Sequence, residues 1–116
     1  KIYYVQGDLF TPLSKSSKFD AILFNAPYLP ADDGEADSWI GRAWAGGATG
    51  RQVIDRFTAK APNHLKQTGR VLLMHSTLAN VDETLRRFAE CHLNARVVAE
   101  RAFPFFETLR LIEAKI

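Results

Sequence analysis

Two short apolar runs of the sequence have the pattern of buried β-strands. They are Asp20–Asn25 and Arg70–His75, and in each run the apolar residues follow one another without alternation. Continuous runs of this length are typical of strands in a parallel sheet whose two faces are both covered by helices. The opening residues Ile2–Val5, which precede Gly7 and Asp8, are predicted to form a further strand.

A helix is predicted between the two apolar runs. Thr49 can cap its start and Gln52, three residues on, can reach back, which makes a capping box. Pro62 predicts a break near residue 61, because proline lacks the N–H that a helix interior needs. Gly69 is expected to end this segment before the next strand. The apolar positions recur at helical spacing, at Val53, Ile54, Phe57 and Ala61.

The same order of elements repeats after the second run. Asn80 and Glu83 predict a capped helix that ends at about residue 91. Two further strands, over Ala95–Phe103 and Thr108–Ile116, are separated by too few residues for a crossover helix, so they should be antiparallel neighbours. The layout is α/β, with a mostly parallel sheet and a C-terminal antiparallel hairpin. The apolar face of the second helix is predicted to consist of Val81, Leu85, Phe88 and Ala89.

Composition limits the possibilities without choosing a function. The chain has 116 residues, the size of one domain, and its 47% hydrophobic and 24% charged residues are typical of a soluble globular protein. The formal net charge of +2 gives no argument for nucleic acid. A single cysteine, Cys91, excludes an internal disulfide and fits a cytoplasmic location. The histidines, His64, His75 and His92, are scattered, so no metal site is predicted.

The residues with the clearest chemical character lie at the end of the first apolar run. They are Asn25, Ala26, Pro27 and Tyr28. The carboxyl ends of strands form the ligand crevice of an open α/β sheet. An amide nitrogen is a poor nucleophile because its lone pair is delocalised into the carbonyl. The side-chain oxygen of Asn25 and the main-chain carbonyl of Ala26 could accept its two N–H bonds, while Pro27 stiffens the loop and Tyr28 offers a flat face. The alternative is an ordinary turn followed by a packed tyrosine.

These residues and others resemble a known family. Asn25–Tyr28 is similar to the Asn-Pro-Pro-Tyr motif of the HemK-like glutamine methyltransferases. Trp44–Arg51 is similar to a Trp-Ala-Gly-Gly motif of their archaeal and eukaryotic branch, and Glu107–Leu109 also matches. The resemblance covers nearly the whole chain. It implies a Rossmann-like class I methyltransferase fold, of which residues 1–116 would be the carboxyl-terminal part of a single domain.

The resemblance also implies a reaction and a cofactor. The expected reaction transfers a methyl group from S-adenosylmethionine to the side-chain amide nitrogen of a glutamine in a translation release factor, with Asn25–Tyr28 as the catalytic residues. Asp8 would accept from the adenine amino group, Leu9 or Phe10 would line the adenine pocket, and Asn25 would also face the cofactor. The alternatives are a turn or helix-cap role for Asp8 and simple packing for Leu9.

Two departures from the family pattern bear on activity. Ala26 replaces the family's first proline, and because this residue contributes a carbonyl, function should be kept. The family's glycine-rich loop and the acidic residue that closes its second strand have no counterpart in this sequence. The isolated chain is therefore expected to bind S-adenosylmethionine weakly or not at all.

In the full family fold Ile2–Val5 would be an edge strand. The branch that this chain resembles works with a small zinc-binding activator subunit, which adds a strand beside that edge. We therefore expect residues 1–7 to be poorly ordered or paired with another chain, either such a subunit or a second copy.

Other interpretations stay open at the level of the sequence. An N6-adenine methyltransferase acting on DNA or RNA would use the same motif, and a catalytically incomplete fragment would act only as a binding module. Trp44–Gly47 would flank the substrate pocket or be a plain connection, and Trp39 is expected to pack. An acidic cluster is either a solvated loop or a surface for a basic release-factor segment; it consists of Asp32, Asp33, Glu35 and Asp37.

Overall fold

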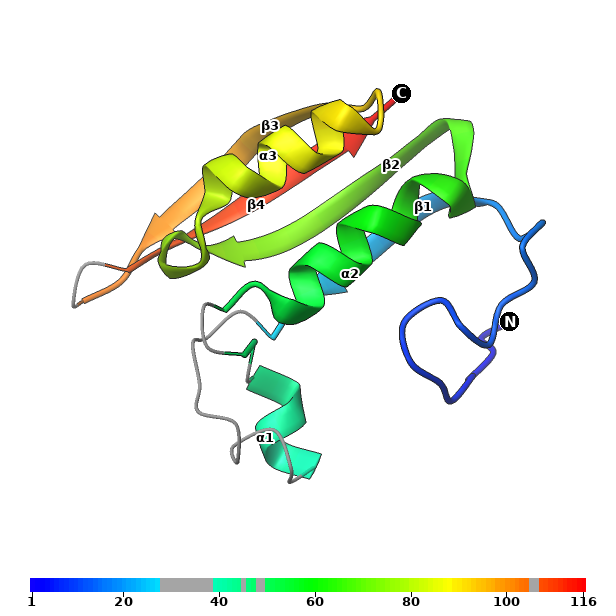
Figure 1. Ribbon diagram of the computed structural model, residues 1–116, viewed down its shortest axis with the longest axis horizontal. Coiled ribbons are helices and arrows are strands. Elements are labelled where there is room, and N and C mark those ends of the chain that lie inside the picture. Colours follow the sequence, from blue (N-terminus) through cyan, green and yellow to red (C-terminus); the bar gives the residue numbers. More distant parts are fainter. Residues whose placement is uncertain (28–38, 45, 48–49, 105–106) are drawn as a thin grey trace.

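A four-stranded mixed sheet organises the chain in the computed structural model, which describes residues 1–27, 39–44, 46–47, 50–104 and 107–116, with backbone alone at 42–44 (Figure 1). The strand order is β1-β2-β4-β3. β1 and β2 are parallel, whereas β4 is antiparallel to both β2 and β3. The predicted hairpin is confirmed, and one neighbouring pair of strands is parallel. The bounds are β1 Phe19–Asn25, β2 Leu65–Ser76, β3 Asn94–Ala102 and β4 Thr108–Lys115.

Two helices, α2 and α3, lie side by side over one face of this sheet (Figure 1). α2 spans Gln52–Lys60 and continues into the 3-10 turn η2, Ala61–His64. After β2 a second 3-10 turn, η3 (Thr77–Ala79), leads into α3, Val81–Glu90. A short helix, α1 (Trp39–Trp44), precedes α2.

The hydrophobic core fills the space between the helices and the sheet. Alternate strand residues point into it, among them Ile22 on β1 and Val71 on β2, which are register partners. The next residue of β1, Leu23, is 72% exposed. The expectation that helices cover both faces is thus not met by the described residues, because α2 and α3 lie on the same side. The larger core side chains are Ile54, Phe57, Leu65, Leu73, Val81, Phe88, Leu93 and Ile112.

The start of α2 differs from the predicted capping box. The N-cap residue is Arg51, which makes no side-chain capping bond, so Gln52 is the first helical residue rather than the third. The backbone N–H of Gln52 donates to the carbonyl of Gly46 at 2.9 Å. A main-chain acceptor thereby satisfies a donor that the helix start leaves free. Thr49 lies outside the described residues.

The other helix boundaries follow the sequence closely. α2 ends at Lys60 and Pro62 sits in η2, which confirms the predicted break. The Asn80 side chain accepts from the N–H of Glu83 at 3.2 Å, which confirms the cap of α3. Ala89, however, is exposed rather than part of the buried face.

Gly69 lies inside β2 and does not precede it, because the strand begins at Leu65. The β1–β2 register shifts here: Phe19 pairs with Leu65, but Ala21 pairs with Arg70. A Cβ at Gly69 would lie 2.7 Å from the Phe19 carbonyl oxygen. The glycine therefore permits a close approach of two backbones, which explains why a residue expected to stop a segment is tolerated within one.

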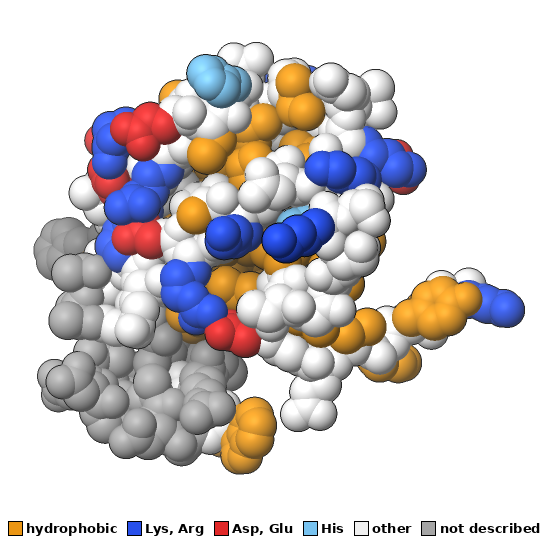
Figure 2. Space-filling model, turned by 45° about the vertical axis from the view of Figure 1, so that its right-hand side comes forward, with side chains coloured by type: hydrophobic (Ala, Val, Ile, Leu, Met, Phe, Trp, Pro, Cys, Tyr) orange, Lys and Arg blue, Asp and Glu red, His pale blue; other side chains and the backbone are white. Residues whose placement is uncertain are grey.

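The amino-terminal residues lie outside the sheet. Ile2–Val5 was predicted as a strand, but it belongs to none of the four strands and its side chains are 63–91% exposed. No strand beside it among the described residues supplies backbone partners, so its apolar character alone does not produce a strand. The segment projects from the body of the molecule as an arm with hydrophobic side chains, on the right of Figure 2.

Replacing Gly69 by alanine should destabilise the protein. The added Cβ would meet the Phe19 carbonyl oxygen and Leu65 Cδ1 at 2.7 and 2.8 Å, so β1 and β2 must separate locally. We expect a loss of about 1–3 kcal/mol in the free energy of unfolding, measured by urea denaturation. The exposed neighbour Gln67→Ala is the control and should change stability by less than about 0.5 kcal/mol. Equal stability of the two variants would contradict this role for Gly69.

Candidate functional site

The Asn25 motif lies at the carboxyl end of a parallel strand. Asn25 is the last residue of β1 and is the register partner of Met74 on β2. Its side chain is exposed, while Ala26 and Pro27 are buried. A polar residue at the end of a strand is thus exposed, and the two residues that follow it are packed into the protein. Tyr28 lies outside the described residues.

Glycines of the Trp-Ala-Gly-Gly stretch pack against this turn. A Cβ at Gly46 would lie 2.5 Å from the Pro27 carbonyl oxygen and 2.8 Å from that of Gly50. Gly47 and Gly50 have φ values of +78° and +75°, a region that favours glycine. We call these three residues the glycine loop. Of these three, Gly46 lies directly on Pro27, so segments distant in sequence meet beside Asn25.

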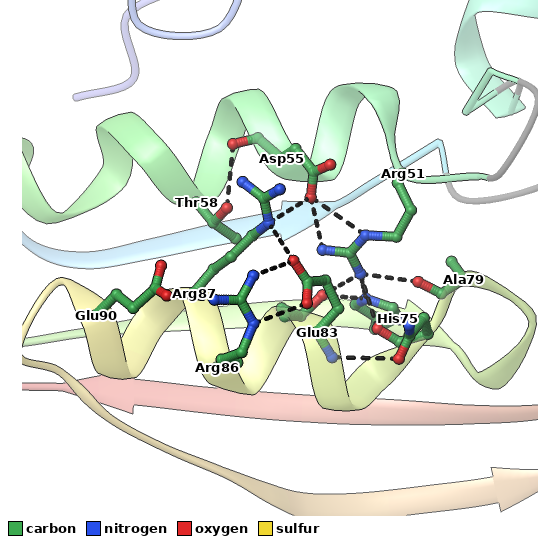
Figure 3. Close-up of polar contacts among 11 residues, drawn as sticks. Arg51, Asp55, Thr58, His75, Ala79, Glu83, Arg86, Arg87 and Glu90 are labelled. Carbon is green, nitrogen blue, oxygen red and sulfur yellow. Dashed lines mark hydrogen bonds and ion pairs between the residues drawn. The ribbon is translucent and has the colours of Figure 1, made fainter.

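A buried arginine follows the glycine loop and joins three elements (Figure 3). Arg51 is 8% exposed. Its Nη1 lies 2.8 Å from the carbonyl oxygens of both Ala79 and Asn80, which connect η3 to α3. Its Nη2 and Nε donate to Asp55 Oδ1, one turn further along α2, at 2.7 and 3.2 Å. Nη1 is also 2.6 Å from Thr84 Oγ1 on α3.

His75, near the end of β2, completes this network. Its Nδ1 is 2.8 Å from the carbonyl oxygen of Ser76, so Nδ1 carries the proton and Nε2 is an acceptor. Thr84 Oγ1, 2.7 Å from Nε2, can then donate to His75 while it accepts from Arg51. Burial, opposed by the Ser76 carbonyl and reinforced by the Arg51 charge, lowers the pKa of His75 to about 4. The histidine is therefore neutral near pH 7.

Ion pairs extend the contact between α2 and α3. Asp55 Oδ1 also lies 3.1 Å from Arg87 Nε, and Arg87 in turn pairs with Glu83. Hydrogen bonds from Arg86, together with Arg87, lower the pKa of Glu83 to about 2. Unlike Arg51, Arg86 is half exposed, with 55% of its side chain accessible to solvent. Solvent screens such pairs, so the buried Arg51 contacts define the junction more strongly.

The carboxyl end of β2 is also tied to the start of β4. Ser76 Oγ donates to Glu107 at 2.8 Å, and the backbone N–H of Thr108 donates to Thr77 Oγ1 at 3.0 Å. Glu107 and Thr108 belong to the stretch that resembles the family. These contacts fix the hairpin at the same edge of the sheet as Asn25.

Asp8 and Leu9 lie on a different part of the structure. The Asp8 carboxylate forms an ion pair with Arg56 of α2, and its carbonyl accepts from Thr11 in a turn. Leu9 is partly buried against the core and has a φ of +51°. Among the described residues, no hydrogen bond or ion pair joins either of them to Asn25. The structure therefore brings the motif and the glycine loop together, but not these two residues.

A pocket of about 770 Å³ opens beside Asp8. Phe10, whose ring stacks on His64 with centroids 4.8 Å apart, contributes to its wall. Basic side chains gather on the face that Figure 2 shows. Those that line this pocket are Lys15, Lys18, Arg56 and Lys60. A local basic surface is thus present despite the small net charge.

Three further sequence predictions concern Trp39, Trp44 and the acidic cluster. Trp39, which the sequence predicts to pack, is 80% exposed at the first position of the short helix α1. The acidic cluster from Asp32 to Asp37 and the side chain of Trp44 lie outside the described residues.

Within the described ranges, no group of three His, Cys, Asp or Glu residues could hold a metal ion, and no helix has the length and apolar character to cross a membrane.

Sequence comparison finds relatives that are methyltransferases by name. No family model matches the chain. A candidate protein N5-glutamine methyltransferase of Methanocaldococcus jannaschii is 38% identical over 114 residues, which are 97% of this chain and 56% of the relative. The methyltransferase HEMK2 of Homo sapiens is 38% identical over 72 residues, which are 61% of this chain and 34% of that protein. The chain thus spans about half the length, or less, of these relatives.

Structure comparison defines the class of fold. The complex of Mtq2 with Trm112 from E. cuniculi, described as responsible for methylation of the translation termination factor eRF1, contains a chain that matches with a TM-score of 0.73. The match has 28% identity and covers 96% of this chain and 59% of that one. The fold is therefore that of a class I methyltransferase. More narrowly, the chain belongs with the HemK-like glutamine methyltransferases and corresponds to their carboxyl-terminal part.

The buried His75 should make stability depend on pH. Its folded-state pKa of about 4 lies below the ordinary histidine value of 6.5, so the unfolded chain binds the proton more readily. This contribution is complete above pH 6.5 and is lost as the pH falls towards 4, by about 3 kcal/mol in total. His75→Gln should remove that part of the pH dependence, measured by urea denaturation between pH 7 and 4.

His92→Gln serves as the control, because His92 is exposed. It should keep the wild-type slope of unfolding free energy against pH. The interpretation of His75 would be wrong if both variants kept that slope.

Proposed function

We propose that this chain carries the amide-binding part of an S-adenosylmethionine-dependent methyltransferase that modifies the side-chain amide nitrogen of a glutamine in a translation release factor. One observation supports the proposal above the others. Asn25 is exposed at the carboxyl end of β1, and the carbonyl of Pro27, two residues on, is packed against Gly46. A fixed backbone beside an exposed amide provides preorganised acceptors, which this chemistry needs.

The roles of the motif residues follow from the substrate. When the glutamine nitrogen attacks the activated methyl carbon, the C–N bond would form as the carbon–sulfur bond breaks, and the sulfur would leave as a neutral thioether. The lone pair of the nitrogen would leave conjugation with the carbonyl and the nitrogen would become tetrahedral. The Asn25 side-chain oxygen and the Ala26 carbonyl would accept its two N–H bonds and follow that change. Tyr28 would lie against the planar amide. No general base is needed before attack, since the nitrogen can lose a proton to water after the new C–N bond forms.

The residues present fit the adenine end of the cofactor. S-adenosylmethionine supplies an activated methyl group. Asp8 has an acceptor-only carboxylate that is 62% exposed beside the pocket, and Leu9 and Phe10 contribute apolar surface there. An acceptor next to apolar side chains suits an adenine ring and its amino group. Asp8 and Leu9 are accordingly the residues that we assign to cofactor binding, together with Asn25.

The release factor is the proposed substrate because the names of two similar proteins refer to methylation of a termination factor or of glutamine. The E. cuniculi complex is described as methylating eRF1, and the M. jannaschii relative is named for glutamine N5 methylation. The identity of 38% over 97% of this chain supports the same amide chemistry here.

A small partner chain is also part of the proposal. The E. cuniculi protein is in complex with Trm112. In the present chain Ile2, Tyr3 and Tyr4 are 80–91% exposed, which is an unusual amount of apolar surface for one short segment. We assign Ile2–Val5 as the segment that pairs with an activator subunit by strand addition.

Asn25→Ala should remove most activity from the full-length protein. The substitution deletes an acceptor for the nucleophile, and by analogy with the loss of one oxyanion-hole donor kcat should fall roughly 10²–10³-fold. Affinity for S-adenosylmethionine, measured by calorimetry, should change much less. Methyl incorporation into the release-factor glutamine, followed by mass spectrometry, gives the rate.

Ala26→Pro is the matched control for this variant, because it changes the same turn while keeping the carbonyl. It should retain activity. Wild-type turnover by Asn25→Ala would refute the assignment, and methylation of adenine in nucleic acid, without methylation of the release factor, would replace the proposed substrate.

Tyr4→Lys should weaken assembly with the activator subunit. Tyr4 is 91% exposed, so the change has little cost within the chain itself, but it puts a charge in a strand that must pair. We expect at least a tenfold loss of affinity, measured by light scattering after co-purification. Val98→Lys, at a 39% exposed position on β3, is the control and should assemble normally. Undiminished assembly of Tyr4→Lys would remove Ile2–Val5 from the interface.

A further inference from the structure

We propose that Arg51 is a positioning residue for the methyl transfer: it holds the glycine loop against Pro27 and thereby fixes the turn that presents the Asn25 and Ala26 acceptors. This inference rests on the proposed function. It assigns to Arg51 a role at a distance, since Arg51 contacts no substrate atom in this mechanism.

The first step is that Arg51 itself is fixed. Its guanidinium is buried, and each of its three nitrogens has a partner. The carbonyls of Ala79 and Asn80 hold one side at 2.8 Å, and Asp55 holds the other. A planar fork of five donors can meet both sides at once, whereas a lysine ammonium can meet only one.

The second step is that the glycines of the loop do not hold their own conformation. Gly47 and Gly50 adopt positive φ values, and Gly50 N–H bonds the Gly47 carbonyl at a rather long 3.2 Å. Glycines lose more backbone entropy on ordering than other residues. An ordered loop of this kind therefore needs an anchor, and Arg51 is the residue attached directly to Gly50.

The third step connects the loop to the acceptors. The Gln52 N–H, directly after Arg51, bonds the Gly46 carbonyl, and Gly46 packs against the Pro27 carbonyl. Ala26 directly precedes Pro27, and with 4% exposure it is packed into the protein next to the residue that Gly46 contacts. A displacement of Arg51 would pass through Gln52 and Gly46 to the turn at Ala26.

A purely stabilising role for Arg51 is the competing explanation, and Arg87 provides the means to test it. Arg87 pairs with the same Asp55 oxygen, at 3.1 Å, and links α3 to α2. Its ion pairs within the described part of the chain are with Asp55 and Glu83, both on the two helices and neither in the glycine loop. Loss of Arg87 therefore weakens the helix contact without releasing the loop.

The experiment compares Arg51→Met and Arg87→Gln in the full-length protein. Arg51→Lys is added in case the methionine variant does not fold. Steady-state methylation of the release factor gives kcat and KM, and calorimetry gives S-adenosylmethionine affinity. The Gln52 N–H donates to the Gly46 carbonyl at 2.9 Å. Hydrogen–deuterium exchange at the Gln52 amide therefore reports loop order without requiring activity. All measurements are made at the same number of degrees below each variant's Tm.

We expect Arg51→Met and Arg51→Lys to lose at least tenfold in kcat with cofactor affinity within threefold of wild type, and to exchange the Gln52 amide at least tenfold faster. Arg87→Gln should match wild type in kcat and in exchange. Equal rate losses in Arg51→Met and Arg87→Gln, or unchanged Gln52 exchange and kcat in a folded Arg51 variant, would overturn the positioning role alone. An inactive wild-type protein would overturn the proposed function and this role with it.

Discussion

The buried guanidinium of Arg51 is the interaction on which this structure most depends. A cation removed from water is costly unless acceptors surround it. Here the acceptors come from Asp55 on α2 and from the carbonyls of Ala79 and Asn80 between η3 and α3. These acceptors surround Arg51 only where the start of α2, the start of α3 and the end of β2 lie together. The positive charge of Arg51 is therefore compensated only in this arrangement of the three elements. Removal of Arg51 would leave Asp55 and these carbonyls without their buried donor.

This junction also sets the geometry beside Asn25. The parallel pairing of β1 and β2 places Asn25 next to Met74, one residue before His75 of the network. The turn after Asn25 is held from outside by Gly46, whose missing side chain permits contact with the Pro27 carbonyl. Strand pairing thus determines where the candidate acceptors lie, and the glycine loop, anchored by Arg51, determines how firmly they are held.

Local patterns in the sequence predict most elements of this fold. The Asn80 cap, the break at Pro62 and the closing hairpin depend on neighbouring residues, and all three are confirmed. Whether Ile2–Val5 forms a strand, and where β2 begins, depend on which strands pair. A local sequence pattern carries no information about that pairing. The motif at Asn25 was recognisable by residue type, but the Arg51 network was not, because its members are distant in sequence. The one local sign of this network in the sequence is His75, a histidine at the end of an apolar run.

Hydrogen–deuterium exchange at the Gln52 amide tests the central claim most directly. This N–H donates to Gly46, and its protection measures how firmly the glycine loop is closed onto the start of α2. In the full-length protein the amide should exchange slowly. In Arg51→Met its exchange should accelerate at least tenfold more than that of the Leu73 amide in the core of β2, which reports global unfolding. Equal exchange at Gln52 in both proteins would show that the loop does not depend on Arg51, and would contradict the anchoring role.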